Sequence, residues 1–174
     1  MKVLVTGGVR SGKSRHAERL MSRFPRVTYV APGPTERDDP DPDWAARLAA
    51  HRARRPARWT TLETRDLAAA LATPEPVLLD CLGTWLTGVL DQRALWDAPV
   101  EQVTDTVSAL LDEAVAALGR RDDVVVVTNE VGFGVVPPHR SGRLFRDLLG
   151  VANQRIAEVC DEVHLVVAGR VLRL

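Results

Sequence analysis

Eight consecutive residues near the start of the chain, 7–14, match the phosphate-binding loop pattern G-x-x-x-x-G-K-[ST]. They follow a short apolar run at 3–6, which we expect to be a buried strand, and a helix is expected to begin near Lys13. Glycines at both ends let the backbone curl so that successive N–H groups point inward, and the positive end of the helix dipole adds to this concave anion site. The segment therefore predicts a loop that binds the triphosphate of a nucleotide.

Two side chains of this loop have expected roles of their own. Lys13 would neutralise charge on the β- and γ-phosphates as a compact cation. The Ser14 hydroxyl would complete the coordination of a Mg²⁺ ion that keeps several waters. A glycine-rich turn without a ligand is the alternative, and the strand before and the helix after argue against it. The predicted loop consists of Gly7, Gly8, Val9, Arg10, Ser11, Gly12, Lys13 and Ser14.

The size and charge of the chain limit its class. With 174 residues, 45% of them hydrophobic, residues 1–174 fit a single phosphate-loop nucleotide-binding catalytic domain. The 23 basic and 23 acidic residues give a formal net charge of zero, so nothing global directs the chain to nucleic acid or to an anionic membrane. We expect no membrane span and a cytoplasmic protein, with Cys81 and Cys160 as reduced thiols in the core.

Apolar runs alternate with helical patterns along the whole chain. Most runs are continuous, which predicts strands buried on both faces of a mostly parallel sheet with helices on both faces. This is an α/β organisation of the P-loop NTPase-like, RecA-like kind, and the end of the chain could form a hairpin or a bent last strand. The expected strands are 3–6, 27–31, 59–62, 77–81, 124–129 and 163–168, with 171–174 as the second arm of the hairpin. The expected helices are 13–23, 43–54, 66–72, 83–90, 99–118 and 140–160.

Two strand ends and one irregular segment are candidates for ligand contacts. The run 77–80 ends in Asp80, a pattern that in phosphate-loop enzymes places an acid near Mg²⁺ and the nucleotide. Glu130 follows the next strand and competes for that role, or it caps the turn that follows; we favour Asp80. The segment 32–42 is rich in Pro and Asp, so we expect a loop at the carboxyl end of the second strand, where open α/β sheets bind ligands.

His51 lies on a predicted helix among many arginines, and two interpretations stay open from the residues alone. In one, the helix simply presents a solvated basic face. In the other, the guanidinium groups hold phosphate oxygens while a neutral His51 attacks a phosphorus atom and forms a covalent phosphoramidate. Nearby positive charge would lower the imidazole pKa and keep the ring nucleophilic. The remaining histidines, His16, His139 and His164, are expected to be structural. The arginines near His51 are Arg47, Arg52, Arg54, Arg55 and Arg58.

Three segments together carry a family resemblance: 6–18 around the phosphate loop, 47–51 ending at His51, and 128–137, which begins Thr-Asn-Glu-Val-Gly. They resemble the bifunctional adenosylcobinamide kinase/adenosylcobinamide-phosphate guanylyltransferase family of cobalamin biosynthesis. The stretch 145–147, Gly150 and the pair 153–154 also look like that family. The similarity spans nearly the whole chain, and the 128–132 segment is its most specific part.

The resemblance implies two transferase reactions. Adenosylcobinamide, a corrinoid, would first be phosphorylated by ATP or GTP. GMP would then pass from GTP to the new phosphate through a guanylyl-histidine, and by motif position that histidine would be His51. The resemblance also suggests a homo-oligomer such as a trimer. Besides the phosphate loop, the implied nucleotide contacts are Ala31, Pro32, Gly33, Arg52, Ala53, Arg54, Arg55, Glu63 and Asp80.

One departure from the family and two alternative functions remain. Where the family has a short acidic segment followed by a Met, this chain has the longer Pro/Asp-rich loop and Trp44. A phosphate-loop kinase or NTPase without covalent guanylylation would use His51 and its arginines only to clamp a substrate phosphate. A non-enzymatic module whose loop is ordered by a bound triphosphate is the third hypothesis.

Overall fold

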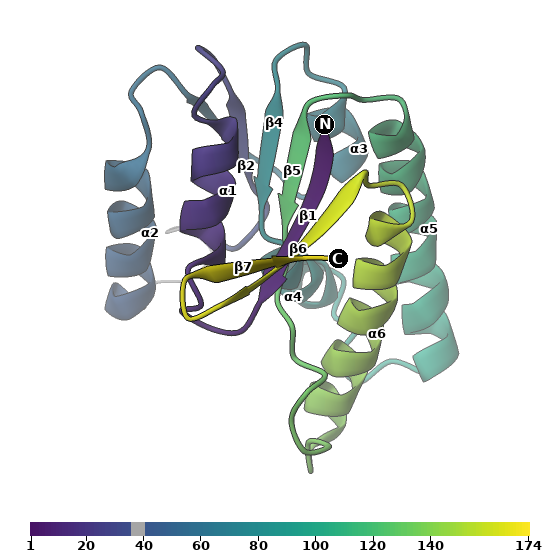
Figure 1. Cartoon of the computed structure of the whole chain (residues 1–174). Coiled ribbons are helices and arrows are strands. Elements are labelled where there is room, and N and C mark those ends of the chain that lie inside the picture. Colours follow the sequence, from purple (N-terminus) through teal and green to yellow (C-terminus); the bar gives the residue numbers. More distant parts are fainter. Residues whose placement is uncertain (36–40) are drawn as a thin grey trace.

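The computed structural model describes residues 1–35 and 41–174, except for the side chains at positions 44 and 47. The described residues form one seven-stranded sheet flanked by helices (Figure 1). Part of the predicted loop at 32–42 therefore lies outside the described residues. So do the side chains of Arg47 and of Trp44, the residue that departs from the family pattern. The strands are β1 Lys2–Gly7, β2 Thr28–Ala31, β3 Thr60–Glu63, β4 Val77–Asp80, β5 Val124–Val127, β6 Glu162–Val167 and β7 Arg170–Arg173. The helices are α1 Lys13–Met21, α2 Pro42–Arg54, α3 Leu67–Leu71, α4 Leu82–Gln92, α5 Val100–Gly119 and α6 Arg140–Ala157.

The order of strands across the sheet is β3-β2-β4-β5-β1-β6-β7. The pairings from β3 through β6 are all parallel, and β7 alone runs antiparallel, beside β6. This confirms the predicted mostly parallel sheet with a terminal hairpin. Strand β5 separates β1 from β4, so the strand that carries the phosphate loop and the strand that ends in Asp80 are second neighbours.

Helices cover both faces, as predicted. Alternate residues of the central strands, such as Leu4 and Leu79, pack into the larger core with α3, α4, α5 and α6. The residues between them, such as Val5 and Leu78, pack on the other face against Ala17 and other residues of α1. Figure 1 shows α1 and α2 on one side of the central strands and α5 and α6 on the other. Strand β3 differs from the prediction of buried strands, because it lies at an edge and most of its residues are exposed.

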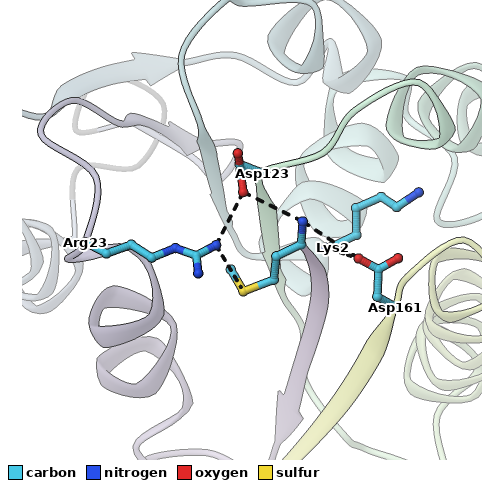
Figure 2. A network of polar contacts seen from close by, with 5 residues as sticks. Lys2, Arg23, Asp123 and Asp161 are labelled. Atoms are coloured by element: carbon cyan, nitrogen blue, oxygen red, sulfur yellow. Dashed lines mark hydrogen bonds and ion pairs between the residues drawn. The ribbon is translucent and has the colours of Figure 1, made fainter.

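A network of ionic contacts occupies the edge of the sheet where β1 and β5 begin (Figure 2). The amino terminus lies 3.7 Å from Asp123 Oδ1 and 3.8 Å from Asp161 Oδ2, and Lys2 N–H donates to the latter oxygen at 2.7 Å. Arg23 Nη2 reaches Asp123 Oδ1 at 3.3 Å. Exposed pairs of this kind contribute about 0–1 kcal/mol each. They tie the chain together at the edge opposite the phosphate loop.

Truncating a fully buried side chain of the larger core tests this packing. Leu111 of α5 is 0% exposed, and we expect Leu111→Ala to lower the free energy of unfolding by about 2–5 kcal/mol, because the apolar contacts are lost and a cavity remains. Urea unfolding measures the change. Leu174→Ala is the matched control: that side chain is 72% exposed, and the expected change is below about 0.5 kcal/mol. Equal losses in the two variants would contradict the packing described here.

Candidate active site at the carboxyl edge of the sheet

Parallel pairing brings several of the predicted site residues to one edge. Val127 of β5 pairs with Asp80 of β4 on one side and with Val5 of β1 on the other, so these three strands end at nearly the same level. The phosphate loop continues from β1, Glu63 ends β3, and Ala31 ends β2 at the same edge. This is the edge at which open α/β sheets bind ligands.

The phosphate loop has the curled shape that its sequence predicts. Ser11 N–H donates to Gly8 O at 3.3 Å, and Lys13 Nζ donates to the same carbonyl at 3.1 Å. Gly12 has a φ of 95°, in the left-handed region that favours glycine. A Cβ atom on Gly7 would lie 2.4 Å from Val166 O, so a larger residue would not fit there. The buried Ser11 hydroxyl has no hydrogen-bond partner among the described residues, which suits a loop shaped around an anion.

The turn between β6 and β7 supports this loop from behind. Gly169 N–H donates to Ser11 O at 2.8 Å, and a Cβ on Gly12 would lie 3.5 Å from the Gly169 Cα. The sequence predicted the hairpin but gave no indication of this contact, because the two segments are more than 150 residues apart in the chain. The hairpin is therefore part of the support of the phosphate loop.

Two of the remaining histidines anchor α1 to the sheet. His16 Nε2 and His164 Nδ1 are 2.8 Å apart, and His164 Nε2 lies 2.7 Å from Glu162 Oε2. Both rings are buried, and burial, followed by the charge of His164, lowers the pKa of His16. This arrangement agrees with the structural role expected for both residues. His139 differs, since it is exposed at the start of α6 and its side chain makes no cap hydrogen bond.

Asp80 joins several elements of the site. Its Oδ2 accepts a hydrogen bond from Tyr29 Oη at 3.1 Å, and burial together with the Asp80 charge raises the pKa of Tyr29 well above its ordinary value. The guanidinium carbon of Arg55 lies 3.4 Å from the centre of the Tyr29 ring. Tyr29 thus connects the carboxylate on β4 to the residue that follows α2. Sequence reasoning missed Tyr29, which reads locally as an ordinary apolar strand residue.

His51 lies half-buried in the last turn of α2, with Arg54 Nη2 3.5 Å from its Nδ1. Burial lowers the pKa of His51, the Asp80 charge raises it, and Arg54 lowers it again, with a net shift downward. A lowered pKa favours the neutral ring, which is the form that a nucleophile requires. The charge of Asp80 acts on the ring, although the last turn of α2 leads to the start of β3, at the edge of the sheet opposite the phosphate loop.

The arginines beside His51 are engaged with acidic and polar partners. Arg54 pairs with Glu18 of α1 at 3.2 Å, and Arg52 pairs with Glu63 at 2.6 Å. Arg55 Nη1 donates to Thr61 Oγ1 at 2.9 Å. These contacts hold the end of α2 against α1 and β3, so a freely solvated basic face does not describe Arg52, Arg54 and Arg55. Arg58 and Ala53 are exposed.

The segment after β2 also lies at this edge. Pro32 is buried, and a Cβ on Gly33 would lie 2.9 Å from the Thr84 Cβ in the first turn of α4. Gly33 therefore lets the chain pass close to the helix that follows Asp80. The three positions Ala31, Pro32 and Gly33 are accordingly brought near Asp80, while residues 36–40 lie outside the described part of the chain.

The donor set at this edge fits a magnesium ion bound together with a triphosphate. Among the described residues there is no group of three or more His, Cys, Asp or Glu side chains that could hold a metal. Mg²⁺ in nucleotide sites needs only one or two carboxylates, with phosphate oxygens and water completing the shell. At this edge Asp80 is the carboxylate, and Ser14 the hydroxyl, that could fill this role. Glu130 is less suited, because its Oε1 accepts from Gly132 N–H at 2.8 Å and so serves the turn after β5.

The electrostatics of His51 can be tested without any substrate. Glu18 raises the pKa of His51, so Glu18→Gln should lower that pKa further, and it also leaves the positive charge of Arg54 uncompensated. Titration of the imidazole Cε1–H resonance by NMR measures the shift. Glu101→Gln, on exposed α5 residue Glu101, is the control and should leave the His51 titration unchanged. A His51 pKa that rises in the Glu18 variant would contradict the described contacts.

Comparison with known proteins agrees with this geometry. A family model described as cobinamide kinase / cobinamide phosphate guanyltransferase matches residues 3–174. The chain is 42% identical to the bifunctional adenosylcobalamin biosynthesis protein CobU of Salmonella typhimurium and 40% identical to that of Escherichia coli, in each case over 97% of both chains. It is 41% identical to the corresponding protein CobP of Pseudomonas aeruginosa, over 97% of this chain and 94% of the relative. The chain belongs to the cobinamide kinase / cobinamide phosphate guanylyltransferase family.

Proposed function

We propose that this chain phosphorylates adenosylcobinamide with ATP or GTP and then transfers GMP from GTP to the new phosphate through a guanylyl-histidine on His51. The family carries the two activities, and the structural observation that supports the covalent step is the position of His51. The His51 ring is half-buried in the last turn of α2, burial lowers its pKa, and the charge of Asp80 acts on it in the opposite direction. Both reactions would then use a single triphosphate site.

In the first reaction the corrinoid hydroxyl attacks the γ-phosphorus, and the nucleoside diphosphate leaves with the electrons of the broken bond. The loop N–H groups and Lys13 would hold the β- and γ-phosphates in place. A Mg²⁺ ion held by Ser14, Asp80 and the triphosphate would supply further charge neutralisation. Positioning and charge stabilisation are the main contributions that a protein makes to phosphoryl transfer.

In the second reaction the unprotonated ring nitrogen of His51 bonds to the α-phosphorus of GTP, and pyrophosphate leaves. The phosphate of the corrinoid then attacks the same phosphorus and releases the imidazole. The ring gains positive charge as its bond to phosphorus forms, and the Asp80 carboxylate, whose charge raises the pKa of His51, would favour that charge. Before the attack, burial and Arg54 favour the neutral ring. During the attack, the Asp80 carboxylate would favour the positive charge that develops on it.

The spacing of the strands suggests how the carboxylates divide their roles. Neighbouring strands lie about 4.8 Å apart, so β4 is about 10 Å and β3 about 19 Å from the strand of the phosphate loop. Asp80 is thus near enough for the metal and the phosphates. Glu63, farther along the edge and paired with Arg52, is better placed to accept hydrogen bonds from guanine N1–H and N2–H₂. Ala31 to Gly33 and residues 52–55 would line the nucleotide between these two ends.

We further propose a cytoplasmic homo-oligomer, such as a trimer. Cys81 and Cys160 are both free thiols, which suits a reducing compartment. The segment after β5 exposes apolar side chains, with Phe133 84% and Val135 94% exposed, and such patches often mark contacts between subunits. In the described part of the chain, none of the helices has the length and apolar character needed to span a membrane.

The covalent step predicts a mass change that depends on His51. Intact-protein mass spectrometry after incubation with GTP and Mg²⁺ should show an acid-labile gain of one GMP in the wild type and none in His51→Ala. His139→Ala is the matched control, because His139 is exposed and is not one of the residues proposed for the site, and it should gain GMP like the wild type. The His51 variant should retain phosphoryl transfer to adenosylcobinamide. A GMP adduct in His51→Ala would refute the covalent role, and its absence from the wild type would favour the simple kinase.

The shared triphosphate site predicts that Lys13→Ala damages both reactions. We expect kcat/KM for phosphoryl transfer and for GMP transfer each to fall by about 100-fold or more, because a cation on the phosphates is lost. Lys2→Ala is the control, since Lys2 lies at the opposite edge of the sheet and should keep both activities (Figure 2). If Lys13→Ala lost one activity and kept the other, the two reactions would need separate sites.

A further inference from the structure

Asn129 stands at the middle of the carboxyl edge and has no role in the reactions described above. It follows β5, which lies between the strand of the phosphate loop and the strand that ends in Asp80. Val127, two residues earlier, pairs with Val5 on one side and with Asp80 on the other. Asn129 is half-buried there. A polar side chain at this position lies between the phosphate loop and Asp80, the two groups proposed to hold the triphosphate.

The side-chain oxygen of Asn129 is already occupied. Cys81 Sγ donates to Asn129 Oδ1 at 3.4 Å, and burial raises the pKa of the Cys81 thiol, so the proton needed for this hydrogen bond is present. A Cβ on Gly83 would lie 2.6 Å from the same oxygen, so glycine leaves the space that Asn129 fills. The amide is therefore held by the residues that directly follow β4.

The backbone around Asn129 is held from two further directions. Asn153 Nδ2 on α6 donates to Asn129 O at 3.0 Å, and Asn153 Oδ1 accepts from Thr128 Oγ1 at 2.6 Å. Glu130 N–H donates to Gly7 O at 3.1 Å, which links this segment to the first residue of the phosphate loop. These contacts restrict the backbone and side chain of Asn129, which costs conformational entropy. Such restriction is typical of a side chain that must be placed accurately.

With Oδ1 engaged, the amide nitrogen is the group that Asn129 offers to a ligand. No hydrogen bond joins Nδ2 to another described residue. The atom is also not one of the fully buried polar atoms without a partner, so solvent or a ligand can reach it. An amide NH₂ supplies two donors, and donors at the site of a transferring phosphoryl group stabilise the charge on its oxygens.

We propose that Asn129 Nδ2 donates a hydrogen bond to an oxygen of the γ-phosphoryl group during the kinase reaction. This inference rests on the proposed function. In that step the corrinoid hydroxyl oxygen forms a bond to the γ-phosphorus, and the bond between that phosphorus and the β–γ bridging oxygen breaks. The nucleoside diphosphate leaves with the electron pair, and the hydroxyl proton passes to water. Asn129 holds the γ-phosphoryl group and takes no covalent part. GMP transfer to His51 occurs at the α-phosphorus and does not need this donor.

The test compares Asn129→Ala and the isosteric Asn129→Asp with the wild type in three measurements. We expect kcat for phosphoryl transfer from ATP to adenosylcobinamide to fall by about 100-fold in the Ala variant. Affinity for the Mg²⁺ complex of a non-hydrolysable ATP analogue should fall by about tenfold, and further in the Asp variant because its carboxylate repels the γ-phosphate. Affinity for Mg²⁺-ADP should stay within about twofold, and the GMP adduct at saturating GTP should still form.

Two results would overturn the proposal. One is phosphoryl transfer and analogue binding that are unchanged in both variants. The other is an equal loss of ADP binding, analogue binding and adduct formation, which would mean that Asn129 only supports the fold. If Asn129→Ala does not fold, the Asp variant carries the test. The matched control is Gln102→Ala, which removes an exposed amide on α5. If the wild type forms no GMP adduct, only the guanylylation proposal fails. The role of Asn129 is tested separately, by comparing the binding of the ATP analogue with the binding of ADP.

Discussion

The parallel pairing of β4, β5 and β1 is the constraint on which the site depends. Because Val127 pairs with both Asp80 and Val5, the ends of three strands share one level, and the segments that follow them meet at one edge. The phosphate loop follows β1, Asp80 ends β4, and the segment after β5 lies between them. A shift of β5 by one residue would move its side chains to the opposite face and break this arrangement.

Within that frame a single carboxylate affects several neighbours. Asp80 accepts the Tyr29 hydroxyl proton in a hydrogen bond, raises the pKa of the Cys81 thiol together with burial, and opposes the burial that lowers the pKa of His51. Tyr29 stacks under Arg55, so the same carboxylate also influences how the end of α2 is held. The protonation state of the proposed nucleophile therefore depends on the packing of α2 against α1 and the sheet. The Glu18–Arg54 ion pair is one of the contacts that hold α2 in this position.

Much of this could be predicted from local sequence. The continuous apolar runs fixed the strands to within a residue or two, and the glycines and Lys13 predicted the phosphate loop. The basic cluster at His51 was ambiguous, because its interpretation requires the positions of Glu18 and Glu63, which come from other elements. Tyr29, and the support of Ser11 by Gly169, could not be predicted, because both depend on contacts between segments that only the folded sheet brings together.

The central claim is that the α-phosphorus of GTP becomes bonded to His51 at a site that also transfers the γ-phosphoryl group. The most direct test labels GTP at the α-phosphorus in one sample and at the γ-phosphorus in another, and then maps the protein-bound label by proteolysis. We predict α-label on the peptide that contains His51 and no protein-bound γ-label. Label on another peptide, or γ-label retained by the protein, would contradict this account.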